Sequence, residues 1–500
     1  MTKMTSTEQN FLDLMKQISA YSEAISLIHW DLRTHIPQKG MEQRSETISL
    51  LSEKVTELKR SEQMKQCITE LKGNKTSPVI QKSVEECERI YQKQQSIPTD
   101  EYVEFIRLSS KSETAWQEAR EKHDFSILAP YLEKLVEFNK KFAEYQGYTD
   151  NKYDGLLNDY EPGLTTEILD RVFNQLKPVL IDLVKKINQS NVEVDSSLLL
   201  KRFPKQAQKD FSLAVLDKMG YDFEAGRLDE TIHPFAIGIN SNDVRVTTRY
   251  DEMDFRTAIF GTIHEGGHAL YEQNIDPDLY QTVLASGASM GIHESQSLFW
   301  ENFVGRSHSF WESHFDLFKK YAPESFQSLE FESFYRAINE VKPSMIRIEA
   351  DELTYSLHII IRYELEKELI NGDLQVKDLP EAWNTKMEEY LGIRPENDLE
   401  GLLQDIHWAA GDIGYFPTYA LGYMYAAQIY NAIKADINLD QMIRFGDFEP
   451  IKAWLTEKIH RHGKMKQPLE LIEQVTGEGL NPDYLIQYLT NKYTEIYQLR

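Results

Sequence analysis

The chain is poor in cysteine and contains no long apolar run. Cys67 and Cys87 are the only cysteines among 500 residues, so neither a disulfide framework nor a thiolate zinc site can be assembled. No stretch approaches the roughly 20 apolar residues of a membrane span, and the N-terminal residues lack the basic and apolar regions of a secretory signal. We therefore expect a cytoplasmic protein without a membrane partner, in which histidines and carboxylates hold any metal.

Positive charge is also scarce. Lys and Arg number 55 against 80 Asp and Glu, a net charge of -25. Such a surface repels phosphate backbones at long range, so we expect no nucleic-acid partner. The composition, 41% hydrophobic and 27% charged, is typical of a soluble globular protein. We expect one domain over residues 1–500.

Most of the chain carries the three- and four-residue apolar spacing of amphipathic helices. A long helix is predicted from Ser6, which stands with Gln9 in the spacing of a capping box. Residues 165–190 and 418–435 show the same periodicity, and no repeat of 20 to 50 residues is present. The predicted fold class is mostly α, a fold of long helices.

A further long helix is predicted for residues 344–371. The segment follows Pro343 and stops before Gly372, which are typical helix boundaries. Residues 232–250 depart from the helical pattern, with Gly and Asn turns and with Val244 and Val246 alternating with polar residues. We predict a small β-sheet there, whose edge strand could hold an extended peptide by main-chain hydrogen bonds.

The segment HEGGH, residues 264–268, is the strongest chemical signal. His264 and His268 are four residues apart on one helix face and can bind one metal ion, while Glu265 is placed to meet a bound water. Composition alone gives roughly 0.05 chance occurrences of His-acid-x-x-His. Gly266 and Gly267 each cost a helix about 1 kcal/mol relative to Ala, which indicates close packing or access at the site.

A hydrolytic zinc takes three protein ligands and keeps one position for water, so a third donor is needed. The metzincin pattern is excluded, because Tyr271 and Asn274 stand where it needs Gly and His. Glu294 is our choice for the third ligand. His293 and Glu301 remain alternatives.

Several ordered motifs resemble those of one family of peptidases. They are HWDLRTHIP at 29, YDGLLNDYEPG at 153, HPF at 233, DVRVT at 243, HEGGH at 264, HESQ at 293, IRIEAD at 346 and GLLQDIHW at 401. In order and spacing they are similar to the thermostable carboxypeptidase family, the carboxypeptidase Taq type. The resemblance extends over nearly the whole chain.

This resemblance implies an all-helical, homodimeric metallocarboxypeptidase with broad side-chain tolerance. Its substrate would be a peptide, held in a deep groove capped by the N-terminal helices, with the active-site motifs within residues 230–410. The metal would be Zn²⁺, with Co²⁺ able to substitute, as imidazole ligands suit both ions. Glu265 would take the proton of the attacking water and deliver it to the leaving amine.

An exopeptidase must also recognise the free carboxylate of its substrate, for which a guanidinium is suited. The resemblance assigns this role to Arg347; without it, a helical pair with Asp351 on a solvated face would be the simpler explanation of that residue. Arg245 is the second candidate. His233 and Asp243 would shape the same pocket or orient a ligand histidine. Candidates for stabilising the oxyanion are His407, Tyr415 and Tyr419.

Two other classes of function remain open. A zinc endopeptidase or oligopeptidase would share the metal site and lack only the carboxylate-binding group, so Arg347 discriminates between them. A helical scaffold without activity would have lost part of the site. The intact His264, Glu265 and His268 set argues against a scaffold.

Overall fold

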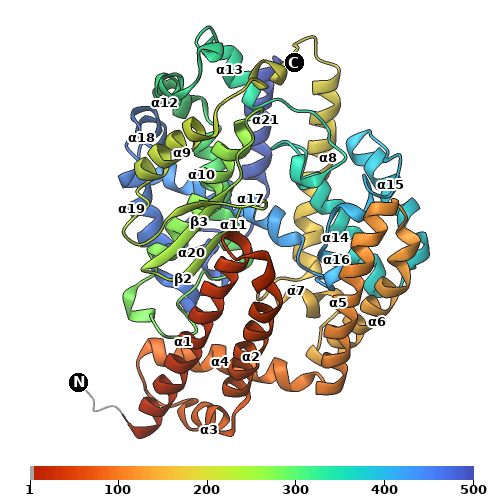
Figure 1. The fold of residues 1–500 in the computed structure, drawn as a ribbon, viewed down its shortest axis with the longest axis vertical. Helices are drawn as coiled ribbons and strands as arrows, with labels where there is room; N and C mark the ends of the chain where they lie inside the picture. The colour runs from red at the N-terminus through yellow and green to blue at the C-terminus, as the bar shows by residue number, and fades with distance from the viewer. Residues whose placement is uncertain (1–4, 500) are drawn as a thin grey trace.

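The computed structural model describes residues 5–499 and confirms a mostly α fold with one small sheet (Figure 1). The chain begins with four helices at the bottom of the view in Figure 1, in red and orange. They are α1 (Ser6–Thr34), α2 (Met41–Arg60), α3 (Glu62–Leu71) and α4 (Pro78–Ser96). These helices enclose a small apolar cluster of their own, which includes Phe11, Met15, Cys67 and Cys87.

The remaining helices build the main body around a second, much larger core. Those before the sheet are α5 (Thr99–Lys122), α6 (Ala129–Gln146), α7 (Lys152–Leu157), α8 (Thr166–Asn188) and α9 (Lys205–Met219). After the sheet come α10 (Arg256–Gln273), α11 (Met290–Leu298), α12 (His308–Tyr321), α13 (Phe331–Ile338), α14 (Tyr355–Asn371), α15 (Leu379–Leu391) and α16 (His407–Ala410). The chain ends with α17 (Pro417–Asp436), α18 (Leu439–Phe445), α19 (Glu449–Lys458), α20 (Pro468–Thr476) and α21 (Asp483–Tyr497).

The predicted sheet lies where the alternating pattern places it. It has the order β1-β3-β2, with β1 (Leu228–Glu230) parallel and β2 (Ala236–Asn240) antiparallel to β3 (Asp243–Thr248). Val244 and Val246 of β3 are fully buried. The sheet packs on α10, so the strand β2 and the HEGGH segment are neighbours.

Helix α1 packs along β2. The ring of Trp30 meets Phe235 edge to face at 5.6 Å, and the Asn240 side chain donates to Glu23 at 3.2 Å. The N-terminal helices therefore lie against the sheet; that they cap the groove remains a prediction. Among residues 5–499, no helix is long and apolar enough to cross a membrane.

Two predicted helix starts are wrong. The capping box of α1 is formed by Thr5 and Glu8, one residue before the predicted Ser6 and Gln9. The helix predicted over residues 344–371 begins only at Tyr355 and does stop at Gly372, whose φ is +87°.

The late start of α14 is explained by one long-range contact of Arg347 and by local contacts of Asp351. Residues Arg347–Glu349 form only a short 3-10 turn, and the backbone N–H of Arg347 donates to the side chain of Gln404 at 2.8 Å. The carboxylate of Asp351 accepts from the backbone N–H groups of Leu353 and Thr354, as an N-terminal cap does. Asp351 is therefore not paired with Arg347.

Candidate active site

The HEGGH segment lies in the middle of α10, and its histidines meet a glutamate from α11. The ring nitrogens Nε2 of His268 and His264 lie 3.5 and 3.9 Å from Oε2 of Glu294. One ligand atom from each of the three residues falls within 4.8 Å of the others. We call these three residues the metal-ligand cluster.

The glycines of HEGGH permit this close approach. A Cβ on Gly267 would lie 2.5 Å from the carbonyl oxygen of Gln296 in α11, and one on Gly266 would lie 2.6 Å from Leu216 in α9. On the other side of α11, a Cβ on Gly422 of α17 would lie 2.6 Å from the side chain of Glu294. The close packing that the sequence indicated is therefore present, and it places Glu294 opposite the histidines.

Each histidine of the cluster is held through its other ring nitrogen. Nδ1 of His264 bonds to Oε2 of Glu301 at 2.9 Å, and Nδ1 of His268 bonds to Nδ1 of His293 at 2.7 Å. Both Nε2 atoms are thereby left to face Glu294. The two alternative ligands, His293 and Glu301, occupy positions behind the histidines.

Glu301 reaches His264 because α11 does not continue as an α-helix. Residues Phe299–Gly305 form a π-helix, a feature frequent at functional sites. Its wider turn presents the Glu301 carboxylate to His264 and to Arg306, whose Nη2 donates to it at 3.0 Å. Burial opposes ionisation of this carboxyl, but His264 and Arg306 lower the pKa of Glu301 to about 2.

The donor set fits a divalent cation such as zinc. Burial lowers the pKa of His268 to about 4, so its ring is neutral and able to coordinate. Burial also acts on His264, but the carboxylates of Glu294 and Glu301 outweigh it and raise its pKa to about 10. Binding of a cation at Nε2 of His264 would therefore release a proton.

Glu265 lines a cavity together with His264 and Glu294, but it does not belong to the metal-ligand cluster. The cavity has a volume of about 450 Å³, and its lining includes His264, Glu265, Glu294, Arg347, Tyr355 and Tyr419. Burial is the main reason that the pKa of Glu265 rises to about 7, helped by the carboxylate of Glu294 and opposed by His264. A carboxyl poised near neutral pH is suited to exchange protons with a substrate.

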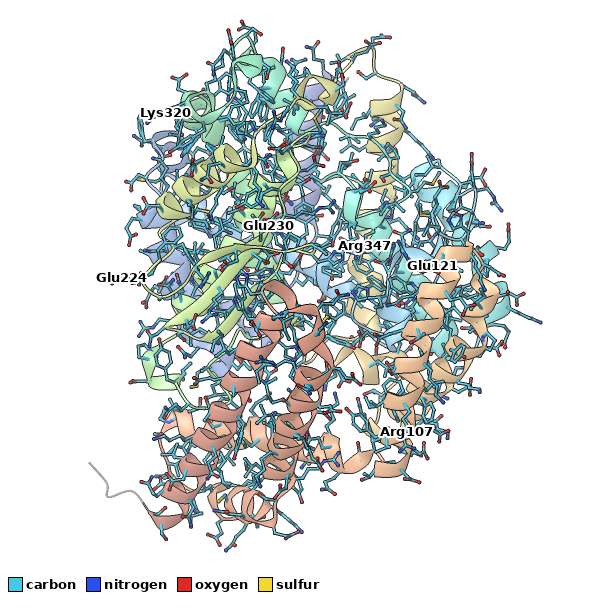
Figure 2. The ribbon with its side chains drawn as sticks, in the orientation of Figure 1. Arg107, Glu121, Glu224, Glu230, Lys320 and Arg347 are labelled. Carbon is cyan, nitrogen blue, oxygen red and sulfur yellow. The ribbon has the colours of Figure 1, made fainter. Side chains whose placement is uncertain are left out.

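Arg347 lines this cavity and belongs to a buried cluster of charges. Its Nε and Nη2 donate to Oδ1 of Asp405 at 3.1 and 2.8 Å, and Arg362 pairs with Oδ2 of the same carboxylate. Gln404 accepts from Arg362 at 2.8 Å as well as from the backbone of Arg347. We call Arg347, Arg362, Gln404 and Asp405 the arginine cluster; Figure 2 shows Arg347 near the centre of the view.

Only one edge of the Arg347 guanidinium remains outside this network. Nη1 donates to the hydroxyl of Tyr355 at 3.2 Å, and the guanidinium carbon lies 5.0 Å from the ring centre of Tyr419. Burial raises the pKa of Tyr355, so its hydroxyl stays protonated as a donor. Tyr355 was not predicted, because it stands in an ordinary helical pattern without a local motif.

Of the three candidates for stabilising the oxyanion, only one lines the cavity. Tyr419 lines the cavity, while His407 and Tyr415 stand behind it, with ring centres 5.2 Å apart and Tyr415 5.3 Å from Tyr419. Burial lowers the pKa of His407 to about 4. The sequence offered no means to rank these three residues.

The candidates on the strand side do not line the cavity. Arg245 is paired with Asp243 through two bonds of 2.7 Å and stacks over Trp30. His233 is exposed, just before Pro234, which does line the cavity. Neither His233 nor Asp243 holds a ligand histidine, because Glu301 and His293 make those contacts.

A helical protein in which an HExxH helix meets a glutamate of the next helix has the construction of a metallopeptidase. The family model described as "Carboxypeptidase Taq (M32) metallopeptidase" matches residues 10–493. The chain therefore belongs to the M32 carboxypeptidase family, as its motifs suggested, and is a metallocarboxypeptidase.

Relatives of known sequence agree over their full lengths. Carboxypeptidase 1 of Bacillus subtilis is 54% identical over 495 residues, which cover 98% of this chain and 99% of that protein. Thermostable carboxypeptidase 1 of Thermus thermophilus is 39% identical, with 98% of each chain covered.

Solved structures also share the whole fold. The M32 carboxypeptidase from Deinococcus radiodurans superposes with a TM-score of 0.97 at 36% identity, covering 99% of this chain and all of that one. A structure of Pyrococcus furiosus carboxypeptidase superposes with a TM-score of 0.96 at 38% identity, covering 99% of this chain and 100% of the other.

Proposed function

We propose that this enzyme uses Zn²⁺ to release C-terminal residues of peptides one at a time, with broad tolerance for the side chain removed. The observation that carries the proposal is one cavity lined by the metal-ligand cluster, through His264 and Glu294, by Glu265 and by Arg347. The first two supply hydrolytic chemistry, and the guanidinium supplies a counter-charge for a free carboxylate.

In this proposal His264, His268 and Glu294 hold the metal through Nε2, Nε2 and a carboxylate oxygen. Two imidazoles and one carboxylate are a ligand set typical of catalytic zinc, and Co²⁺ accepts the same donors. When bound, the metal would polarise the scissile carbonyl and lower the pKa of a water, so that this water can lose a proton and attack at neutral pH.

Glu265 is the proposed base. Its carboxylate accepts a proton from the attacking water while the new carbon–oxygen bond forms, and it delivers that proton to the amine nitrogen as the carbon–nitrogen bond breaks. A pKa of about 7 lets one group perform both transfers. Burial of Glu265, which is only 8% exposed, keeps bulk water from competing for the proton.

Arg347 and Tyr355 are proposed to bind the substrate carboxylate. Because Asp405 already occupies Nε and Nη2 of Arg347, the substrate would receive one bond from Nη1 and one from the Tyr355 hydroxyl. Tyr419 is the proposed donor to the oxyanion, with His407 and Tyr415 packed behind it. His233, Asp243 and Arg245 are proposed to shape the strand side of the groove.

Three broader expectations accompany this proposal: a homodimer, a cytoplasmic location and a groove capped by the N-terminal helices. Both cysteines are buried and unpaired, and burial raises the pKa of Cys87 to about 12. Free thiols agree with a reducing compartment.

The deciding experiment compares one peptide with its C-terminally amidated twin, each incubated with zinc-loaded or cobalt-loaded enzyme and followed by mass spectrometry. Shortening of the free peptide from its C-terminus, with the amidated peptide intact, is the expected result. Internal cleavage of both peptides would instead favour an endopeptidase or oligopeptidase and leave Arg347 without its proposed role.

A further inference from the structure

A relay of three hydrogen-bonded side chains, His268, His293 and Glu272, leads away from the metal-ligand cluster, and the proposed reaction does not use its outer two members directly. Nδ1 of His268 lies 2.7 Å from Nδ1 of His293, and Nε2 of His293 lies 2.8 Å from Oε1 of Glu272. Glu272 and His268 both belong to α10, four residues apart. They share one helix face, but His293 from α11 is inserted between them.

The hydrogen bonds of this relay determine which ring nitrogen of each histidine carries the proton. A carboxylate can only accept, so Glu272 requires the proton of His293 to be on Nε2. The neutral ring of His293 then has a bare Nδ1, which can only accept from His268. His268 therefore carries its proton on Nδ1, and its Nε2 is left with the lone pair that a metal needs.

The opposite arrangement would block the site. If His293 carried its proton on Nδ1, it would donate to Nδ1 of His268, and the neutral ring of His268 would hold its proton on Nε2. That atom faces Glu294 and could no longer coordinate a cation. Glu272 excludes this tautomer of His293, because its carboxylate can only accept a hydrogen bond from Nε2 of that ring.

The residues around His293 and Glu272 pack closely against these two side chains. A Cβ on Gly287 would lie 2.6 Å from the His293 ring, and a Cβ on Gly238 would lie 2.9 Å from Oε2 of Glu272. The backbone N–H of Gly287 also donates to Oε1 of Glu272 at 3.2 Å. On its other side, the His293 ring lies 5.1 Å from the ring of Tyr271.

We propose that Glu272 and His293 are positioning residues, which fix the tautomer and ring orientation of His268 and so set the affinity of the site for its metal. This inference rests on the proposed ligand role of His268. The other histidine, His264, receives the same control in one step from Glu301. Outer contacts of this kind typically change metal affinity by about 10- to 100-fold.

The test measures zinc affinity by competition with a chelating dye, on folded protein stripped of metal. Glu272→Ala is expected to weaken zinc binding about 10- to 100-fold. Glu272→Gln should keep most of the affinity, because the amide oxygen still accepts from Nε2 of His293. Equal losses for these two variants would overturn the proposal, since the accepting oxygen would then be irrelevant. Unchanged affinity in Glu272→Ala would overturn it as well.

A second pair of variants tests the ring itself and decides the question if Glu272→Ala does not fold. In His293→Asn an amide oxygen can still accept from Nδ1 of His268, whereas His293→Phe offers no acceptor. We expect zinc affinity to fall clearly further in His293→Phe than in His293→Asn. Equal losses of zinc affinity in both variants would contradict the proposed role of His293.

Two further variants separate the possible failures. Glu23→Ala removes a carboxylate that bonds Asn240 and does not touch the relay, so it reports the effect of charge alone and should leave zinc affinity unchanged. His268→Ala should lose the metal. If it does not, the proposed ligand set fails; if it does while Glu272→Ala binds normally, only the relay fails.

Discussion

The metal-ligand cluster and the arginine cluster border the same cavity but are built in opposite ways. In the first, supporting residues occupy the outer nitrogens of both histidines, and the inner atoms remain free for a cation. In the second, Asp405 engages two of the three guanidinium nitrogens of Arg347, and Nη1 donates to Tyr355, which lines the cavity. In the proposed function, the first cluster therefore binds an ion through its free inner atoms, whereas the second offers the substrate only one edge of Arg347.

This difference has an electrostatic reason. Asp405 is buried, yet the guanidinium groups of Arg362 and Arg347 hold its pKa well below the usual range. One carboxylate between two guanidinium groups leaves a net positive charge, which suits an anionic ligand that must bind and leave repeatedly. The metal-ligand cluster has one carboxylate of its own, Glu294, and the carboxylates of Glu265 and Glu301 lie close to His264, a surrounding that suits a cation.

The largest expected effect comes from removing a ligand. Glu294→Ala should lose both metal and activity, because two imidazoles alone bind a cation weakly. Elemental analysis after gel filtration should find about one metal per unmodified chain and almost none in the variant. Full occupancy in the variant would move the third ligand to Glu301 or His293.

Removing the base should separate binding from chemistry. Glu265→Gln should lower kcat by about 10²- to 10⁴-fold, since proton transfer is lost. Its metal content should stay equal to that of the unmodified enzyme, because Glu265 contributes none of the three ligand atoms. Measuring kcat and metal content on the same sample checks both statements, and retained activity would remove Glu265 from its role.

The arginine cluster should show a smaller and more selective effect. Arg347→Ala should lower kcat/KM for peptides with a free carboxylate about 10- to 100-fold, the worth of a hydrogen bond to a charged group. Amidated peptides, if cleaved at all, should be affected much less. Arg256→Ala is the matched control, because Arg256 is also paired with an aspartate, Asp254, but does not line the cavity. Equal losses on both kinds of peptide would make Arg347 a structural residue.

The smallest effect is a dependence on pH. Glu265 must be ionised to accept a proton, and its pKa is raised to about 7, so kcat/KM should fall as pH decreases through that value. A bound cation favours the ionised carboxylate, which places the midpoint at or below about 7. Rates measured from pH 8 to pH 5, with metal content checked at each pH, test this. A flat profile down to pH 5 would contradict it.

The sequence was sufficient for the parts of the site that depend on local spacing. The pairing of His264 with His268 and the place of Glu265 beside them follow from the helical repeat, whereas Glu294 was one choice among three, with His293 and Glu301 as alternatives. The two glycines of HEGGH indicated close packing, which Gln296 and Leu216 provide.

What could not be predicted depends on contacts between distant segments. Residues 344–354 have helical periodicity, but the bonds from Arg347 to Gln404 and Asp405, 57 and 58 positions away, hold them out of the helix. Tyr355 becomes a candidate only because those bonds turn Arg347 toward it. The hydrogen bonds behind His268 could not be predicted from the spacing of residues in the sequence either, because His293 of α11 lies between His268 and Glu272 of α10.

The π-helix at Phe299–Gly305 also bears on how this chain can change during evolution. An α-helix turns by about 100° for each residue, so deletion of one residue before Glu301 would swing that carboxylate away from His264, and one after it would turn Arg306 away. Surface loops of the enzyme can gain or lose residues without consequence for the site. In this one turn, the contacts of Glu301 with His264 and Arg306 depend on the number of residues as well as on their identity.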